Sequence, residues 1–461
     1  MQQGGSEDGQ AQAGLGPQDT PGTTLPALLE ALAATLPDAP ALLCLSRPPL
    51  SRAALGAAAR RVAEGLVCQG VGPGDRVALL LPPRPEAVVL LLALARLGAT
   101  ALPLDPRLGA EEIATLLSRG RAALVAVAWG GTLPARLALA IGAGRGPLRG
   151  VIGLDAGGEA ALAGLPVLPW KTLDAMPEHA GDHGTAGSAL LALPAGGDAL
   201  AIHAQGAVAL HAEAVAAGLG LDAAAGLLLW LPLLSPDGLA AAFAALLSGA
   251  RLLLPEDDVA ADSLARAQAA THLVALPAQL EAMEPLAARR PYAMLRLAAA
   301  PGPARAPTLA AREFWGTAET QGVFALREEQ GFRPLPAAVL HDAETLAVTA
   351  ATLPGGTLLL GLPVSLAGGC FVPAGPRRDG LLCHDGVAVS PAATAAFLRR
   401  QPGVAAVCMQ DGLAATIRPV AGGALSVEAL QASCAQWLGE ASRPSRLTLA
   451  EPVALEDEAA A

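Results

Sequence analysis

The most informative stretch of the chain is RVALLLPPRPEAVVLLLALARLGATALPLDP, residues 76–106. The segment at 76–81, apolar after Arg76, has the length of a buried strand. The mostly apolar segment at 86–97 has the length of a core helix, and a second strand-like segment follows at 99–104. Strands that are apolar on both faces are typical of parallel sheets, in which helices cover each face. The stretch therefore predicts a β-α-β unit.

The same alternation continues on both sides of this unit. Towards the N-terminus, helix-type segments at 25–36 and 52–69 flank a short strand at 41–45. Towards the C-terminus, the expected helices and strands lie at residues 110–119, 123–128, 226–231, 239–248, 251–255, 262–270 and 272–276. This rhythm predicts an α/β fold with a large N-terminal domain of parallel-sheet β-α units and helices on both faces.

The C-terminal part of the chain has a different pattern. Helices are expected at 390–400 and 426–438, and the strands at 405–410 and 413–419 are expected to pair antiparallel. This pattern predicts a small α+β domain. The expected organisation is a disordered tail at 1–21, a large N-terminal domain at 22–385, a small C-terminal domain at 386–455 and a second tail at 456–461.

Composition excludes several classes of function. The net charge of -11 is spread thinly, and no basic stripe of the kind that binds nucleic acid is present. The apolar runs are interrupted, as by Arg96 and Pro103, so no membrane span is expected. The first 21 residues lack the basic start and apolar core of a secretory leader, and the six cysteines are scattered. A cytoplasmic protein with free thiols is therefore expected.

Several short motifs occur in a meaningful order along the chain. They are the turn and strand at 70–78, the helix end and strand at 97–106, the segments 231–239 and 247–250, the strand at 271–277, the sequence WGTAET at 315–320, and the segments 389–391 and 401–404. Each is weak by itself, but six in order with sensible spacing are specific. Together they resemble the acyl-adenylate-forming family of AMP-dependent synthetases and ligases, which includes acyl-CoA synthetases.

The resemblance implies a two-step chemistry. In that family a carboxylate attacks the α-phosphate of ATP to give an acyl-adenylate, and a thiol or amine then accepts the acyl group. The first step needs phosphate donors, Mg²⁺ and a cation that offsets charge on phosphorus. ATP and Mg²⁺ are thus the implied cofactors if the protein is active, and none is certain.

The motif at 315–320 retains half of the residues that the family uses there. Glu319 stands where the family has its Mg²⁺-binding glutamate, Gly316 is kept, and Trp315 replaces a tyrosine but could stack on a purine. Ala318 replaces the threonine that contacts the α-phosphate. The alternative is that Trp315 is a core residue and Glu319 belongs to a solvated loop.

The phosphate loop is degenerate. The family uses a loop rich in Ser, Thr and Gly that ends in Pro-Lys-Gly, whereas residues 193–201 read LPAGGDALA. Gly196 and Gly197 could still form a turn, but the segment has no hydroxyl and no lysine, and Asp198 would place a negative charge beside a polyphosphate.

The two remaining nucleotide motifs are weaker. Asp385 is the nearest match to the family's ribose-binding aspartate, and the alternative is a plain turn residue. After Pro452, where the family has its catalytic lysine, the ungapped chain has Glu458. The single lysine, Lys171, lies in an unrelated segment and is expected on the surface.

The acyl pocket is implied by the segment that resembles the family's pocket helix. Ser235, Gly238 and Leu239 are the candidate lining residues. Ser235 and Asp237 do not indicate a hydrolase, because no G-x-S-x-G elbow is present.

Three functions remain open at this point. The first is a non-catalytic pseudo-ligase that binds a small carboxylic acid, an acyl ligand or a protein partner. The second is an active ATP-dependent carboxylate-activating ligase with an atypical site. The third is an enzyme limited to acyl transfer from a preformed adenylate. The sequence predicts neither a nucleic-acid partner nor a membrane partner.

Overall fold

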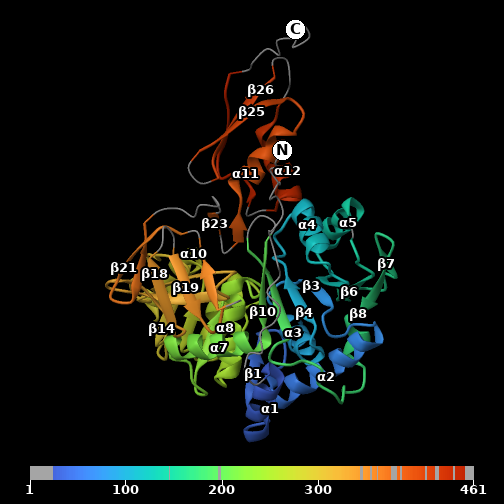
Figure 1. The fold of residues 1–461 in the computed structure, drawn as a ribbon, viewed down its shortest axis with the longest axis vertical. Helices are drawn as coiled ribbons and strands as arrows, with labels where there is room; N and C mark the ends of the chain where they lie inside the picture. The colour runs from blue at the N-terminus through green and yellow to red at the C-terminus, as the bar shows by residue number, and fades with distance from the viewer. Residues whose placement is uncertain are drawn as a thin grey trace, which may run out of the picture.

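The protein is described from a computed structural model. It covers residues 24–144, 146–195, 199–342, 346–353, 356–360, 362–374, 382–384, 387–410, 413–420, 425–439 and 442–451. Figure 1 shows a broad body built on two large sheets, with a narrow C-terminal module above it.

The expected β-α-β unit lies at the centre of an eight-stranded sheet. In spatial order its strands are β10 (Leu200–Ala204), β9 (Ala189–Pro194), β4 (Thr100–Pro103), β3 (Arg76–Leu80), β5 (Leu124–Ala128), β6 (Gly150–Leu154), β8 (Leu165–Pro169) and β7 (Ala161–Leu162). Strand β3 pairs in parallel with both β4 and β5. Leu79 faces one cluster of core residues and Leu80 the opposite one, so both faces are buried as predicted.

The second sheet has eleven strands. In spatial order they are β2 (Leu50–Ser51), β1 (Pro40–Leu43), β12 (Arg251–Leu253), β11 (Gly226–Leu229), β13 (His272–Val274), β14 (Leu297–Ala300), β15 (Arg312–Thr317), β16 (Gly322–Glu328), β17 (Gly331–Pro334), β22 (Cys370–Pro373) and β21 (Val364–Ala367). From β1 to β15 the pairing is parallel, and from β15 onward it is antiparallel. The parallel half was predicted. The antiparallel half was not, because its tight connections need no helix between strands.

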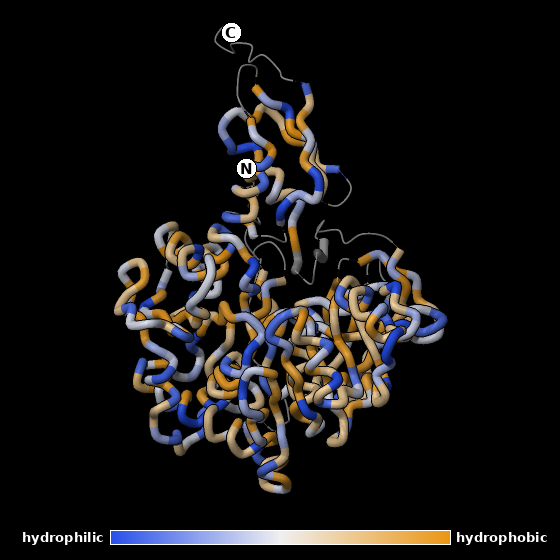
Figure 2. Tube along the Cα trace, turned by 180° about the vertical axis from the view of Figure 1, so that it is seen from behind, coloured by the Kyte–Doolittle hydropathy of each residue, from blue (hydrophilic) through white to orange (hydrophobic). Residues whose placement is uncertain are grey.

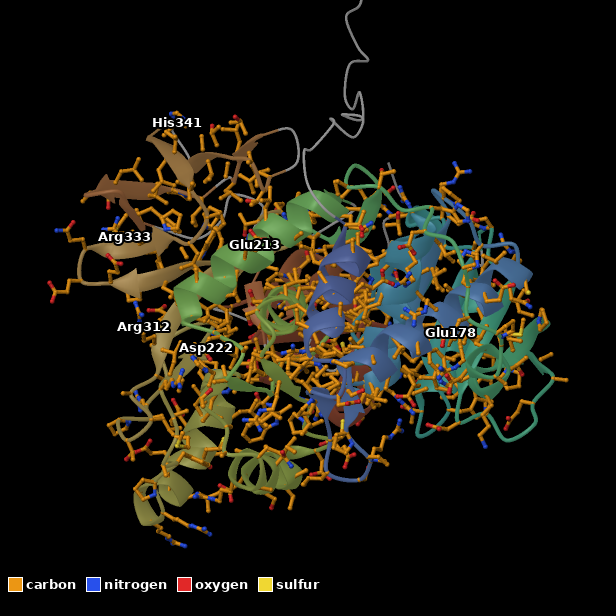
Figure 3. The ribbon with its side chains drawn as sticks, turned by 90° about the horizontal axis from the view of Figure 1, so that it is seen from below. Glu178, Glu213, Asp222, Arg312, Arg333 and His341 are labelled. Carbon is orange, nitrogen blue, oxygen red and sulfur yellow. The ribbon has the colours of Figure 1, made fainter. Side chains whose placement is uncertain are left out.

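Helices form three layers around the two sheets. They are α1 (Leu25–Thr35), α2 (Arg52–Cys68), α3 (Pro85–Leu97), α7 (Gln205–Leu219) and α8 (Pro236–Leu247) between the sheets, α4 (Ala110–Arg119) and α5 (Leu133–Ala143) outside the first sheet, and α9 (Asp258–Ala267) and α10 (Pro277–Arg289) outside the second. Figure 3, viewed from below, shows the green helix α7 running beside the blue helices of the middle layer. The short helix α6 (Trp170–Asp174) packs on α2.

The remaining elements are small. Three strands, β18 (Ala338–Asp342), β19 (Leu346–Ala350) and β20 (Thr357–Leu359), form one sheet, and β23 (Leu382–His384) pairs with β24 (Val387–Val389). The C-terminal module contains α11 (Pro391–Arg399), β25 (Val404–Met409), β26 (Ala415–Pro419), α12 (Val427–Trp437) and β27 (Leu447–Leu449). Its β25–β26 pair is antiparallel, as predicted. The proposed boundary at 385–386 lies outside the described residues.

The C-terminal module contacts the body beside α4. Leu108 and Gly439 form an antiparallel bridge. A Cβ on Gly109 would lie 2.1 Å from the Trp437 carbonyl carbon, so this approach of two backbones requires glycine. Arg400 also pairs with Glu111 at 2.9 Å. Figure 2 shows the same narrow module above the body from behind.

Two expectations about the whole chain can be compared with the described part. No described helix is long and apolar enough to cross a membrane. Five cysteines are free thiols, and they are Cys44, Cys68, Cys370, Cys408 and Cys434.

Candidate functional site

The motif at 315–320 forms the turn between β15 and β16, which we call the motif hairpin (residues 315–322). The Thr317 amide donates to the Thr320 hydroxyl at 2.9 Å, and the Thr320 amide donates to the Thr317 carbonyl at 3.2 Å. Gln321 closes the turn with a left-handed φ of 64°. The family-like sequence therefore makes a tight loop whose backbone is held by its own threonines.

The motif hairpin touches the N-terminus of α8 through glycine. A Cβ on Gly322 would lie 2.2 Å from the Pro236 carbonyl oxygen, and one on Gly316 would lie 2.1 Å from the Gly322 oxygen. Real side chains never fit such distances, so the two segments can meet only because both positions are glycine. This places the candidate acyl-pocket helix directly against the candidate nucleotide motif.

The candidate pocket residue Ser235 is the N-cap of α8. Its hydroxyl accepts from the Gly238 amide at 3.0 Å and donates to the Pro232 carbonyl at 2.8 Å. Gly238 and Leu239 are buried in the first turn, and a Cβ on Gly238 would lie 2.1 Å from the Pro232 oxygen. The Ser235 hydroxyl is thus committed to the helix terminus rather than to a ligand.

Trp315 packs among aromatic side chains. Its ring meets Phe371 edge-on at a centroid distance of 5.1 Å and Phe324 at 6.4 Å. These are the contacts of a core residue, although the side chain is only half-buried. A stacking role toward a purine stays a prediction.

A histidine from the other sheet holds the motif hairpin. His203 in β10 donates from Nε2 to the Ala318 carbonyl at 2.7 Å, and its Nδ1 is buried without a partner. Burial lowers its pKa to about 4, although the hydrogen bond to Ala318 and the Glu319 charge act in the opposite direction. His203 is therefore neutral at neutral pH, and it joins the two sheets at the site.

A second buried histidine lies close to the first. His211 in α7 is 2% exposed, and burial followed by repulsion from His203 lowers its pKa to about 3. Sequence reasoning missed both residues. The available signal was a histidine inside an apolar strand and another inside an apolar helix, which is more often a core position than a site.

Asp237 is the least satisfied charged group near the motif hairpin. It occupies the first turn of α8, next to the backbone that Gly322 approaches. Its Oδ1 is buried without a hydrogen-bond partner, and burial alone raises its pKa to about 7. Sequence reasoning noted this residue only as part of a rejected hydrolase motif, because nothing in the sequence shows that its carboxyl has no partner.

The other candidate residues are placed as follows. Glu319 is half-buried in the motif hairpin, close enough to His203 to influence its pKa. Gly196, Gly197 and Asp385 lie outside the described residues. Within the described chain no three His, Cys, Asp or Glu side chains gather as a metal site. A single carboxylate could still hold Mg²⁺, which is usually completed by water and phosphate oxygens.

Among the described residues, the lysine of α6 and the arginines of β15, β16 and β17 lie away from the turn of the motif hairpin. Lys171 is exposed on α6, a helix that packs against α2 and the first sheet. At the opposite end of β15 and β16, Arg327 is bound to Glu313 at 2.8 Å, and Arg312 donates to the Arg327 carbonyl at 3.4 Å. Arg327 is four residues from Val323, roughly 13 Å along the strand. Figure 3 labels Arg312 and Arg333 at the outer edge of this sheet.

Comparison with known proteins assigns one segment of the chain to a family. The model of a family described as AMP-binding enzyme matches residues 29–161. Residues 29–161 belong to the AMP-binding enzyme family. The match includes the β3–α3–β4 unit and ends before the motif hairpin. The family model therefore covers much of the first sheet and not the candidate site.

One curated relative and two solved structures extend the comparison. A dimodular nonribosomal peptide synthase of Bacillus subtilis is 41% identical over 105 residues, which cover 23% of this chain and 4% of the synthase. The fold is like that of o-succinylbenzoate CoA synthetase from Bacillus subtilis, with TM-score 0.73 and 19% identity over 93% of this chain and 95% of the other. The structure of an amide bond synthetase from Marinactinospora thermotolerans gives TM-score 0.76 and 18% identity over 93% of this chain and 96% of the other.

These likenesses differ in what they establish. The peptide synthase aligns over a small part of its own length, so the alignment concerns a segment and not that protein's whole activity. The two structures share the fold of nearly the entire chain at low identity. The AMP-binding fold is therefore present, while its chemistry depends on the site residues.

Proposed function

We propose that this AMP-binding protein is a non-catalytic member of its family, one that binds a carboxylate or acyl ligand without activating it through ATP. The observation that carries the proposal is the charge of the site residues. Adenylation builds negative charge on a phosphorus that already carries oxyanions, and cations must offset it. The phosphate-loop segment 193–201 has no Lys, Arg, Ser or Thr, and the only lysine of the chain is exposed on α6.

The described surroundings of the motif hairpin support the same conclusion. Asp237 adds a half-buried carboxyl at the N-terminus of α8, where a phosphate would otherwise gain from the helix dipole. Arg327 and Arg333 are paired with Glu313 and Glu328 at the far end of the sheet. Glu319 could bind Mg²⁺, but the residues do not fit the polyphosphate that Mg²⁺ would accompany, and we derive no step through ATP.

A ligand site without adenylation remains compatible with the fold. The first turn of α8 and the motif hairpin meet through glycine backbones, which leaves a rigid, preorganised wall. A small carboxylic acid, an acyl group or a protein partner is the proposed occupant.

The proposal is tested by pyrophosphate release from ATP and Mg²⁺ with a panel of carboxylic acids. An active ligase of the same family is assayed in parallel as the positive control. We expect no turnover with any acid. A ligand that binds the folded state raises Tm, so we also expect Tm to stay the same when ATP is added. Turnover on any acid contradicts the proposal and favours the active ligase.

A second assay addresses acyl transfer alone. Preformed acyl-adenylates are supplied with a thiol acceptor, and thioester formation is followed. We expect no formation above the rate without protein. Thioester production in this assay, combined with no pyrophosphate release in the first, would identify an enzyme limited to the second half-reaction.

A further inference from the structure

A cavity of about 290 Å³ lies at the opposite end of α8 from the motif hairpin. It is enclosed by α1, α2, α3 and the residues at the end of α8, including Leu246 and Ala250. Leu246 is eight residues after Gly238, roughly 12 Å along the helix. In Figure 1, α1 is at the bottom of the body and the C-terminal module is at the top. The cavity is therefore separate from the candidate site.

The cavity exists because small residues face it. Ala33 comes from α1, and Gly56 and Ala59 come from α2. A Cβ on Gly56 would meet only one atom within 4 Å, Nη1 of Arg60 at 3.6 Å. Leu29 and Leu32 of α1 also line the space and stay half-buried. Apolar walls of this kind gain free energy when an apolar group replaces water or empty space against them.

The charged side chains at the walls are not all compensated. Arg60 binds Glu178 at 2.6 Å and Glu30 at 3.3 Å. Arg96 binds Asp182 at 2.6 Å and also contacts Glu30. Glu178 is labelled in Figure 3, on the side of the molecule where the blue helices lie. Two of the three lining arginines thus already have carboxylate partners.

Arg52 differs from the other two. It donates to the Gly249 carbonyl at 2.7 Å, just after the end of α8, and no carboxylate of the described residues contacts it. A guanidinium has five N–H donors, so most of its donors have no partner among the described residues. The cavity therefore combines an apolar interior with one cation whose charge is not neutralised.

We propose that this cavity binds a free alkyl carboxylate, with the hydrocarbon chain against α1 and α2 and the carboxylate on Arg52. Burial of the chain supplies the affinity, and the charge-assisted hydrogen bond to Arg52 selects an anion. This second site is independent of the proposed function, because it uses none of the residues of the motif hairpin.

The ligand class is tested by calorimetric titration of the full-length protein with decanoate, decanol and decylammonium. We expect decanoate to bind at least about tenfold more tightly than decanol, from one charge-assisted hydrogen bond, and decylammonium to bind most weakly. Equal binding of decanoate and decanol would overturn the role of Arg52. No binding of any of the three would overturn the cavity itself as a site.

Variants locate the site. Gly56→Leu places a leucine side chain in the cavity, and decanoate binding is expected to be lost. The variant should fold, because leucine is a better helix former than glycine inside a helix. Gly142→Leu makes the same change on α5, where a Cβ has no neighbour within 4 Å, and decanoate binding should be unchanged. Decanoate binding by Gly56→Leu at wild-type strength would refute the assignment.

Two more variants separate charge from shape and from the other site. Arg52→Gln should reduce decanoate affinity to that of decanol while decanol affinity stays the same. Glu319→Gln, in the motif hairpin, should leave decanoate binding unchanged. A loss of decanoate binding in Glu319→Gln, with Arg52→Gln unaffected, would move the ligand to the candidate site and overturn the proposal.

Discussion

The β3–α3–β4 unit and the motif hairpin differ in how well their residues meet the needs of each region. In the β-α-β unit every side chain from Ala87 to Leu97 is buried, and the chain meets that demand with Ala, Val and Leu almost throughout. Around the motif hairpin, half of the residues expected for nucleotide chemistry are replaced, and Oδ1 of Asp237 is buried without a hydrogen-bond partner. Packing tolerates any aliphatic residue of suitable volume, whereas phosphate chemistry needs particular charged groups at particular places.

The comparison is tested most strongly by a core substitution. Leu90→Ala removes a fully buried side chain of α3, and we expect a loss of about 3 kcal/mol in the free energy of unfolding. Chemical denaturation measures the change. Leu139→Ala on α5, where the leucine is 40% exposed, is the matched control and should change it by less than about 1 kcal/mol. Equal effects would contradict the assignment of α3 to the core.

The contact between α8 and the motif hairpin gives the next largest effect. Gly322→Ala places a methyl group 2.2 Å from the Pro236 carbonyl oxygen at a φ of 83°, and we expect a loss of about 2 to 3 kcal/mol. Gly220→Ala is the control, because its φ is 72° but its Cβ has no neighbour within 4 Å. It should cost about 1 kcal/mol. The same cost in both variants would mean that the backbone contact is absent.

The carboxyl of Asp237 makes the stability of the folded protein depend on pH. The pKa of Asp237 is raised from 3.8 to about 7, so between these values the folded protein holds a proton that the unfolded chain has lost, and stability falls as pH rises. Asp237→Asn removes that penalty. We expect the variant to be more stable than the wild type by on the order of 2 kcal/mol at pH 8 and to lose this advantage near pH 4.

The control for Asp237→Asn is Glu213→Gln, an exposed carboxyl on α7 that is labelled in Figure 3. Its denaturation curves should follow those of the wild type at both pH values. A destabilised Asp237→Asn at pH 8 would show that the carboxylate has a partner in solution.

The smallest effect is expected at the helix cap. Ser235→Ala removes the hydrogen bond to the Gly238 amide and should cost about 1 kcal/mol. Ser51→Ala removes the equivalent bond to the Ala54 amide at the start of α2, in the β-α-β half of the chain, and should cost the same. If Ser235→Ala instead alters carboxylate binding without altering stability, Ser235 belongs to the pocket and not to the cap.

Most of the first sheet could be predicted because its signal is local. A buried strand and a buried helix differ in length and in the residues that bound them, and Pro85 and Gly98 mark the two ends of α3. The antiparallel half of the second sheet was missed because its strands are joined by turns without a strong signal, although β15 and β16 are at least as long as the predicted strands β3 and β4. The described residues from β15 to β22 form no helix that would have indicated this topology.

The candidate site divides in the same way. The sequence by itself determined the AMP-binding pattern, the loss of lysine from the phosphate loop and the position of Glu319, since each follows from residue type and order. Only the tertiary structure decided that His203 holds the hairpin, that Oδ1 of Asp237 has no partner and that Arg52 lines an apolar cavity. The physical reason is that hydrogen bonding and burial depend on groups far apart in the chain, as the 115 residues between His203 and Ala318 illustrate.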